Sequence, residues 1–413
     1  MRLTMKLKFK IINRILSALF CIGLHLFAYT QNPEIDTFRE LTEKQHRINA
    51  QDIKDLISES DTGEYNRIMI SGYIQAQFEY YQRDLVESFG PSSTFYMRRA
   101  RIKFTYDALD GITVVLQPDF SKGNLSLRDA YAELSLPKIK NITLLAGKFR
   151  RPNYESEYGS NEKEILGRSN VLKNIYPDLR DIGLKLEYIG IALPLKLKIA
   201  LMNGNLNEKQ TNDVDTRKDI MALATYSVVI PKPGISIDFG MNFYTGGIRV
   251  KSTNYISGYA GTIDSIALGD YLNKRWISGE MQVFMDFLGG MAIKGEFVKG
   301  INAYDISTSS PASITNTYRV RYFSGFYVYF IKYLGSKNQF ITRYDYFDPN
   351  TKVAGDATQK DIYYKTIAFA WEYFHNKNTS FALSYECPKN EINSEVNKEL
   401  KDNIFKARIQ VKF

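Results

Sequence analysis

The feature of this sequence that most restricts its fold is an alternation of apolar and polar residues that recurs in about sixteen segments after residue 66. In residues 67–80, for example, Ile70 and Ile74 fall on one side of an extended chain, and Ser71 and Gln75 fall on the other. Because successive side chains of a β-strand point to opposite faces, this two-residue period predicts strands. The predicted strands are 66–80, 95–108, 111–120, 126–136, 142–150, 179–189, 194–204, 217–230, 235–246, 273–287, 289–300, 317–331, 338–347, 361–375, 379–388 and 402–413.

The connections between these segments sort by parity. Those after even-numbered segments are short, as in 231–234 (PKPG) and 376–378 (NKN), whereas those after odd-numbered segments are mostly long and polar, the longest being 151–178. Only 121–125 breaks the rule. A barrel with short periplasmic turns and long outer loops requires this asymmetry, and a Greek-key sandwich does not. We therefore predict an all-β fold: a transmembrane antiparallel barrel of about 16 strands over residues 65–413.

The composition agrees with a sheet that meets lipid on one face and water on the other. Aromatic residues make up 14% of the 413 residues, yet the mean hydropathy is -0.29. After residue 30 the sequence contains no apolar run long enough for a spanning helix, so a membrane protein of this sequence must cross as a closed sheet. Closure is needed because open strand edges would leave unpaired backbone groups in hydrocarbon.

The first 64 residues are predicted to lie outside the barrel. Residues 1–30 combine five basic residues, no acidic residue and an apolar stretch from Ile15 to Ala28, as in a secretory signal peptide. They carry five of the nine net positive charges and leave +4, which does not indicate a nucleic-acid-binding protein. Residues 31–64 show helical spacing and predict a short periplasmic amphipathic leader.

The chain ends with Phe413 after an alternating strand. A terminal aromatic residue in this setting is typical of bacterial outer-membrane barrels, whose assembly machinery reads the last strand. Phe413 is therefore predicted to be the outer-membrane assembly signal. Its partners would be the barrel-assembly machinery and outer-membrane lipid.

Several motifs resemble the phosphate-selective porin O and P family. They are FYMRRARIKF (95–104), LRDAYAEL (127–134), LLAGKFRRPNYESEYGS (144–160), YPDLRDIGLKLEY (176–188), LMNGN (201–205) and ITRYDYFDPN (341–350). The resemblance spans about residues 65–413. It implies a homotrimeric sixteen-stranded anion channel of a Gram-negative outer membrane, whose third loop folds inward and whose solute is a small anion such as phosphate or polyphosphate.

Cations on the polar face are the candidates for an anion path, because a low-dielectric wall focuses the field of its charges on the ion. The strand at 95–108 and the segment entering the third loop each supply a basic triplet, and further cations follow along the wall. Lys148 falls by parity on the lipid face, so its inclusion depends on a local break at Gly147. The anion-path candidates are Arg99, Arg101, Lys103, Lys148, Arg150, Arg151, Lys294, Arg319, Arg321, Arg343, Lys406 and Arg408. Three other predicted wall cations are Lys185, Lys196 and Lys198.

A competing interpretation assigns these cations to structural pairs that keep the barrel rigid. Acidic residues on the same predicted faces could supply the partners: Asp107, Asp129, Glu133, Asp181, Glu187, Glu296 and Asp345. For any single cation, pairing is the better prediction, and for the two basic triplets the alternatives are balanced.

Other functional classes lack support in the residues. Only His46 and His375 remain after the predicted signal peptide, which supports neither a histidine-based catalytic triad nor a zinc site. We therefore predict no enzymatic activity, no cofactor, no metal site and no nucleic-acid partner. The alternative function is a non-selective or non-conducting outer-membrane barrel that serves as a binding or adhesion platform.

Overall fold

The computed structural model describes residues 67–413 except for 83–91, 110, 122, 124, 136–140, 154–164, 176–178, 191–192, 205–212, 214, 252, 258–261, 306–317, 353–361, 393–397 and 401. The predicted signal peptide (1–30) and leader (31–64) lie outside the described residues. Both remain predictions.

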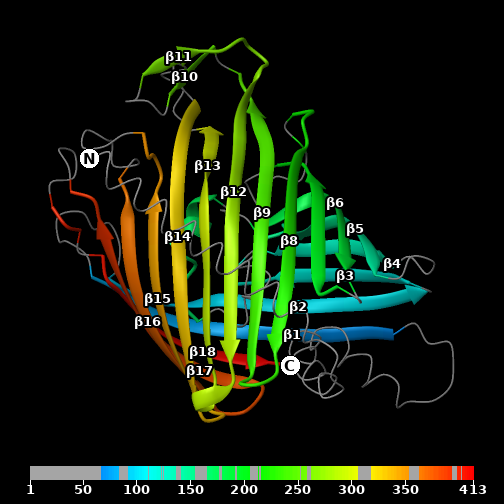
Figure 1. Ribbon diagram of the computed structural model, residues 1–413, viewed down its shortest axis with the longest axis vertical. Helices are drawn as coiled ribbons and strands as arrows, with labels where there is room; N and C mark the ends of the chain where they lie inside the picture. The colour runs from blue at the N-terminus through cyan, green and yellow to red at the C-terminus, as the bar shows by residue number, and fades with distance from the viewer. Residues whose placement is uncertain are drawn as a thin grey trace. The chain divides into compact units, whose positions relative to one another are not determined.

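The described chain is a closed antiparallel β-barrel of sixteen long strands (Figure 1). Its first nine strands are β1 (Arg67–Tyr81), β2 (Ser93–Leu109), β3 (Ile112–Asp119), β4 (Ser126–Ser135), β5 (Ile142–Arg150), β6 (Arg180–Ile189), β7 (Leu195–Met202), β8 (Asp219–Ile230) and β9 (Ile235–Arg249). Its other seven are β12 (Tyr271–Met285), β13 (Met291–Asp305), β14 (Tyr318–Leu334), β15 (Asn338–Asp348), β16 (Tyr364–Phe374), β17 (Thr379–Asn390) and β18 (Ile404–Lys412).

Each long strand pairs with its neighbour in the chain, and β1 pairs antiparallel with β18 to close the ring. We call this pairing of β1 with β18 the seam. Its register is continuous from Tyr73 opposite Lys412 to Tyr81 opposite Ile404. All sixteen predicted strands are confirmed, most of them to within a few residues at each end. No helix among the described residues is both long and apolar enough to cross a bilayer.

The connections follow the predicted parity. The turns after β8 (231–234) and β16 (375–378) are short, whereas the connection after β5 covers 151–179. The long connection between β9 and β12 holds two further strands that the sequence did not predict, β10 (Asn254–Ile256) and β11 (Ile263–Ser265). They form a hairpin that reaches β14 (Figure 1), where β10 pairs parallel through Tyr255 opposite Tyr318. Three residues per strand are too few for a two-residue period to stand out from a polar loop.

The burial pattern of the strands is the reverse of that in a soluble protein. On β1, Gln75 and Gln77 are buried, with 0% and 3% of their surface exposed, whereas Ile70 and Ile74 expose 59% and 46%. On β18, Arg408 and Gln410 are buried between the exposed side chains of Ile409 and Val411. Polar rows therefore face the interior of the barrel, and apolar rows face outward, where only a lipid environment removes them from water.

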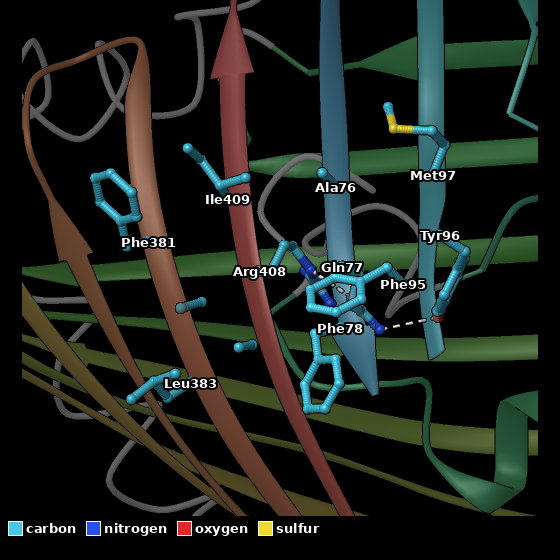
Figure 2. Close-up of a pocket in the computed structure, with 12 residues that line it drawn as sticks. Ala76, Gln77, Phe78, Phe95, Tyr96, Met97, Phe381, Leu383, Arg408 and Ile409 are labelled. Atoms are coloured by element: carbon cyan, nitrogen blue, oxygen red, sulfur yellow. Dashed lines mark hydrogen bonds between the residues drawn. The ribbon is translucent and has the colours of Figure 1, made fainter. Parts of the chain in front are cut away.

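An apolar groove lies on the outward face of the seam (Figure 2). The side chains of Ala76, Phe78, Phe381 and Ile409 line it, and Ala407 is a further lining residue. Since Phe78 and Ala407 are cross-strand partners, the groove follows the pairing of β1 with β18. It belongs to the surface that the bilayer covers.

The carboxyl terminus completes the seam. The backbone N–H of Phe413 donates to the carbonyl of Gly72 at 2.9 Å, and the N–H of Gly72 donates to the carbonyl of Phe413 at 2.8 Å. A Cβ at position 72 would lie 2.5 Å from both the carbonyl oxygen of Arg101 and the Phe413 ring. Gly72 is thus required for the close approach of β2 and the terminal aromatic ring. The role of Phe413 as an assembly signal stays a prediction.

Replacing Gly72 with Ala should destabilise the folded barrel by about 1–3 kcal/mol, the usual cost of overpacking a tight site. The matched control is Gly279→Ala on β12, where a Cβ would meet nothing within 4 Å. The measurement is the temperature at which detergent-solubilised barrel loses its folded electrophoretic mobility. Equal temperatures for the two variants would contradict the close contact.

Candidate functional site: the barrel interior

A segment between β5 and β6 enters the barrel next to the wall formed by β6 and β9. Arg151 is fully buried, and its guanidinium nitrogen lies 2.7 Å from Asp181 Oδ2. The side-chain amide of Asn242, on the inward face of β9, donates to the carbonyl of Pro152 at 2.6 Å. These contacts direct the chain inward as it leaves β5.

The same connection contacts another part of the inner wall from Ile165 onward, at β15, β16 and β18. Arg408 on β18 donates from its guanidinium to the carbonyl of Ile165 at 3.0 Å. The backbone N–H of Asn170 lies 3.3 Å from Asp345 Oδ1 on β15, and the Asn170 side chain donates to Thr366 Oγ1 on β16 at 2.9 Å. Because these partners point into the barrel from β15, β16 and β18, residues 165–170 lie inside it.

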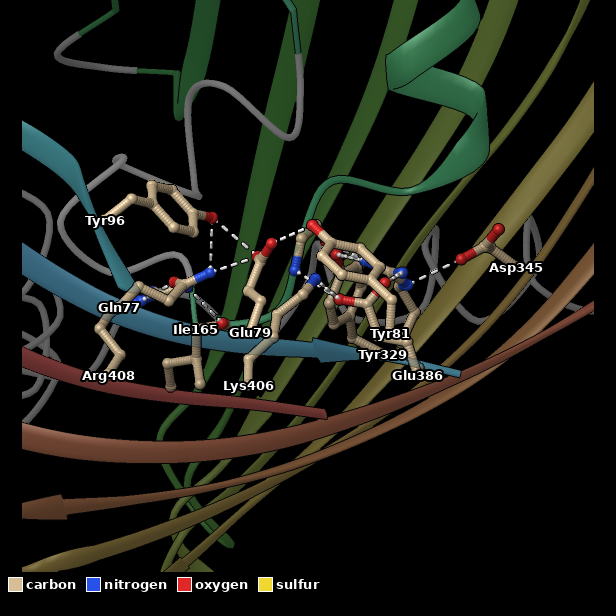
Figure 3. Close-up of polar contacts among 12 residues, drawn as sticks. Gln77, Glu79, Tyr81, Tyr96, Ile165, Tyr329, Asp345, Glu386, Lys406 and Arg408 are labelled. Carbon is tan, nitrogen blue, oxygen red and sulfur yellow. Dashed lines mark hydrogen bonds and ion pairs between the residues drawn. The ribbon is translucent and has the colours of Figure 1, made fainter. Parts of the chain in front are cut away.

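The peptide groups of Gly167 are held from two strands. Its N–H donates to Glu386 Oε1 on β17 at 3.1 Å, and its carbonyl accepts from the guanidinium of Arg343 on β15. Glu386 also accepts from Lys406 Nζ at 2.5 Å (Figure 3). Arg343 Nε lies 2.8 Å from Asp345 Oδ2. We call Arg343, Glu386 and Lys406 the Gly167 clamp.

The clamp is buried and tightly packed. Arg343 and Glu386 each expose 1% of their surface, and Lys406 exposes 8%. A Cβ at Gly167 would lie 3.1 Å from Glu386 Oε1 and 3.3 Å from Lys406 Nζ. A side chain at position 167 would therefore crowd both groups.

A short helix follows the clamp, α5 (Asn170–Ile175). Val171, Leu172 and Ile175 are buried on the inner wall and belong to one apolar cluster with Tyr327 and Phe347. Gly325 on β14 allows the helix to approach closely, because a Cβ at this position would lie 2.8 Å from Val171 Cγ2. The apolar face of α5 thus packs on β14 and β15.

The basic triplet on β2 lies on the inner wall near the seam. Arg101 Nε is 2.7 Å from Asp119 Oδ2 on β3, and Arg101 also donates to the Tyr73 hydroxyl at 3.0 Å. Arg99 donates to Gln75 Oε1 at 3.0 Å, and Lys103 is half-buried opposite Ser71. The structure therefore places all three on the inner wall, as predicted from alternation.

The triplet at the start of the third loop is not brought together. Arg151 lies in the interior, and Arg150 faces Arg180 in the register of β5 with β6. Gly147 has a φ of +130°, so the expected backbone irregularity is present. Lys148 nevertheless stays opposite Ile182, which lies on the same face of β6 as Leu184. Leu184 exposes 49% of its surface, so this placement does not support Lys148 as part of an anion path.

The remaining candidates lie along β13, β14 and β18. Lys294 Nζ lies 4.7 Å from the centroid of the Tyr329 ring, and Arg321 is buried on the face of β14 that also carries Phe323 and Tyr327. Arg319 is two residues before Arg321 on the same face. Arg408, beside the clamp, also donates to Gln77 Oε1 at 2.8 Å. For all twelve candidates the role in an anion path stays a prediction.

Several of the predicted structural pairs are present in the structure. Arg151 pairs with Asp181, Arg343 with Asp345, and Lys185 with Glu187 at 2.7 Å. Lys198 Nζ lies 3.5 Å from the same Glu187 carboxylate, and Asp129 pairs with Arg180 at 2.7 Å. The pairing interpretation therefore describes a good part of this wall.

Sequence analysis missed three acidic residues and one cation. Asp119 and Glu386 were not considered as partners for Arg101 and Lys406. Lys274, which lies 3.0 Å from Asp219 Oδ2, was not considered as a wall cation. Asp219 also accepts from the hydroxyl of Tyr244, whose ring stacks on Trp276 at 3.7 Å. The alternation along β12 and β17 places Lys274 and Glu386 on the inward face, so this sequence pattern could have identified both residues.

Among the described residues, no group of three or more His, Cys, Asp and Glu side chains could hold a metal ion. The described interior carries many paired charges, and residues 151–153 and 165–175 of one connection contact two separate parts of its wall. Such an arrangement suits passage of small polar solutes through the barrel.

Comparison with known proteins identifies the class of barrel. The sequence profile of the phosphate-selective porin O and P family matches residues 68–232. The protein is an outer-membrane channel of the porin type. The resemblance found in the motifs is thus confirmed over residues 68–232, and the channel resides in a Gram-negative outer membrane.

Solved structures of other porins share the fold at low sequence identity. An anion-selective porin from Comamonas acidovorans has a TM-score of 0.56 and 12% identity, with 84% of this chain and 100% of that chain covered. The outer membrane channel DcaP of Acinetobacter baumannii has a TM-score of 0.53 and 13% identity, with 86% and 99% covered.

A third similar structure is the trimer form of OmpT, an outer membrane protein of Vibrio cholerae. Its TM-score is 0.53 and its identity 12%, with 85% of this chain and 100% of that chain covered. No curated protein matches this porin.

Removing the Arg343 charge should leave Asp345 and Glu386 buried without their shared cation. Arg343→Gln should therefore lower the free energy of unfolding of this porin by roughly 3–5 kcal/mol, as when one partner of a buried pair is removed. The measurement is denaturant unfolding of the barrel in detergent micelles.

The matched control is Lys218→Gln, because Lys218 pairs with Asp213 in an outer connection and its side chain is 42% exposed. That change should cost less than about 1 kcal/mol. Equal costs for the two variants would contradict the buried clamp.

Proposed function

We propose that this channel passes small anions by passive diffusion, phosphate or polyphosphate among them. The observation that carries the proposal is that residues 151–153 and 165–175, from one connection, contact two separate parts of the inner wall, at Asn242 and at the Gly167 clamp. Loop residues held inside the barrel narrow the path of a solute and bring the solute close to charged side chains. The third loop then forms the constriction.

Charge at the constriction supports an anion preference. Arg343, Lys406 and Arg408 converge on residues 165–167, and Arg99 and Arg101 lie nearby in the sheet on β2, which pairs with β1. Guanidinium groups offer paired donors to phosphate oxygens, whereas an ammonium group acts as a mobile point charge. Because the surrounding wall has a low dielectric constant, it focuses these fields on the passing ion.

Conduction and selectivity set opposite requirements on such a path. A single tight phosphate cage would hold the ion, whereas several moderate sites in series let it move on. The ion pairs of the wall, such as Arg101 with Asp119, moderate the attraction at each step. A series of partly compensated cations is therefore a suitable path for a diffusing anion.

We also propose that the protein is not an enzyme and assembles as a homotrimer. His375, the histidine within the described residues, is exposed in the turn after β16. The trimer form of the similar OmpT structure supports a trimer of this porin. The barrel-assembly machinery would read the strand that ends at Phe413.

Purified protein in planar bilayers should give ohmic current steps, and a potassium chloride gradient should give a reversal potential of the sign for anion preference. A cation-selective reversal potential would overturn the anion proposal. A folded trimer without conductance would favour the binding or adhesion platform.

Phosphate titrated into chloride at constant ionic strength should lower the single-channel current if phosphate occupies a site in the path. Sulfate serves as the control for divalent charge alone. Currents that follow only bulk conductivity would remove phosphate as the preferred solute and leave general anion diffusion.

A further inference from the structure

The outward face of the barrel changes from apolar to basic along β12 and β13, which lie side by side (Figure 1). On β12 the outward side chains of Ile277 and Met281 expose 40% and 46% of their surface. Two residues from Ile277, on the side of the long connection between β9 and β12, the outward side chain is Arg275, and it is exposed. Lys299 on β13 is exposed on the same face, opposite Ile277. The apolar rows therefore end at a pair of cations.

The position of these cations matches the edge of a bilayer. Met285 is the residue of the outward row of β12 nearest the short turn, and Arg275 lies ten residues away from it. At roughly 3.3 Å per residue and a strand tilt of roughly 40°, this separation is about 25 Å along the membrane normal, the height of the apolar band of such barrels. Because the short turns are periplasmic, Arg275 and Lys299 lie at the level of the headgroups of the outer leaflet.

A third cation is held on the same face. The guanidinium of Arg217, just before β8, donates to Asn273 Oδ1 at 3.2 Å and lies 5.7 Å from the centroid of the Tyr271 ring. Tyr271 and Asn273 precede Arg275 in the outward row of β12. The neighbouring acid Asp215 accepts from the backbone N–H of Arg217 at 2.9 Å. We call Arg217, Arg275 and Lys299 the outer basic patch.

The charge of the outer basic patch is not balanced by the protein. Arg275 is opposite Ile301 on β13, two residues from Lys299. Such diagonal neighbours are about 7–8 Å apart, so long side chains at these positions reach one another. Within the described part of the chain, none of the three cations of the patch forms an ion pair. Asp305, at the end of β13, is six residues beyond Lys299. An anion from outside the protein would offset the repulsion between the cations.

We propose that the outer basic patch binds the phosphorylated headgroup of an outer-leaflet lipid, whose acyl chains lie along the apolar rows next to it. The guanidinium groups of Arg217 and Arg275 offer paired donors to phosphate oxygens, and the Lys299 ammonium adds a point charge. Beside these cations, Phe243 and Phe297 expose 42% and 51% of their surface on the outward face. A free phosphate ion would use the cations alone, whereas a phosphorylated lipid uses the cations and the apolar rows.

The first test measures binding of lipid A, a disaccharide with two phosphates and several acyl chains, to the purified barrel in detergent micelles by native mass spectrometry. The double variant Arg275→Gln, Lys299→Gln should raise the Kd by about tenfold or more. Each cation near a charged headgroup contributes roughly fivefold in affinity. The matched control is Lys337→Gln, Lys377→Gln, the same loss of charge at exposed positions in the short turns. Its Kd should equal that of the unchanged protein.

The second test separates charge from folding and lipid from free ion. The exchange Arg275→Lys, Lys299→Arg keeps both charges and should retain the affinity of the unchanged protein. Lipid A without its two phosphates should bind the unchanged protein as weakly as lipid A binds the glutamine variant. Inorganic phosphate at the concentration of the lipid should leave bound lipid A in place, because it lacks the acyl chains.

Three results would overturn the lipid site. The glutamine variant and its control could bind lipid A equally, lipid A could bind equally with and without phosphates, or inorganic phosphate could displace it. The second result would mean that acyl chains alone adhere to the apolar rows, and the third that the patch is a site for a free anion. None of these results bears on ion conduction, which the reversal potential tests separately.

Discussion

The hydrogen-bond ladder that closes between β1 and β18 is the constraint on which the rest of this structure depends. In hydrocarbon an unpaired backbone N–H or C=O costs several kcal/mol, so a sheet can span only if it has no free edge. The pairing of Gly72 with Phe413 extends that ladder to the last residue of the chain. Gly72 permits the close approach, because any side chain there would meet Arg101 and Phe413.

Closure also determines which side chains can be used for function. With lipid outside, a strand has one face that must be apolar and one that can be charged. The inner face then gathers cations and acids from distant parts of the chain, such as Arg343 on β15 and Lys406 on β18, around one carboxylate, Glu386. The third loop uses this wall as its support. Its backbone binds the charged groups at Gly167, and its apolar residues cover Gly325 and Phe347.

Much of the barrel could be predicted from the sequence because its information is local. The period of two, the turn residues and the parity of connection lengths each depend on neighbours in the chain, and they located all sixteen long strands. The same alternation placed Arg99, Arg101 and Lys103 on the inner wall. It failed for the hairpin of β10 and β11, whose strands of three residues are too short to show a period.

The interior could be predicted only in part because its contacts are not local. Arg408 binds the carbonyl of Ile165, and Asn170 binds Asp345, across long stretches of sequence. No spacing rule relates these positions. The pattern of cations also does not reveal Glu386, although this acid binds both Gly167 and Lys406 in the clamp.

The account requires that the polar rows face water and the apolar rows face lipid, and neighbouring positions on β1 test this most directly. Ile70 and Ser71 are both exposed but point to opposite faces. Nitroxide labels on single cysteines at each position, in a Cys387→Ser background in lipid vesicles, can be compared for relaxation by oxygen and by a water-soluble nickel complex. The label at 70 should respond mainly to oxygen and the label at 71 mainly to nickel. The opposite result would mean that the apolar rows face water and the charged rows face lipid. It would contradict a channel lined by the charged rows.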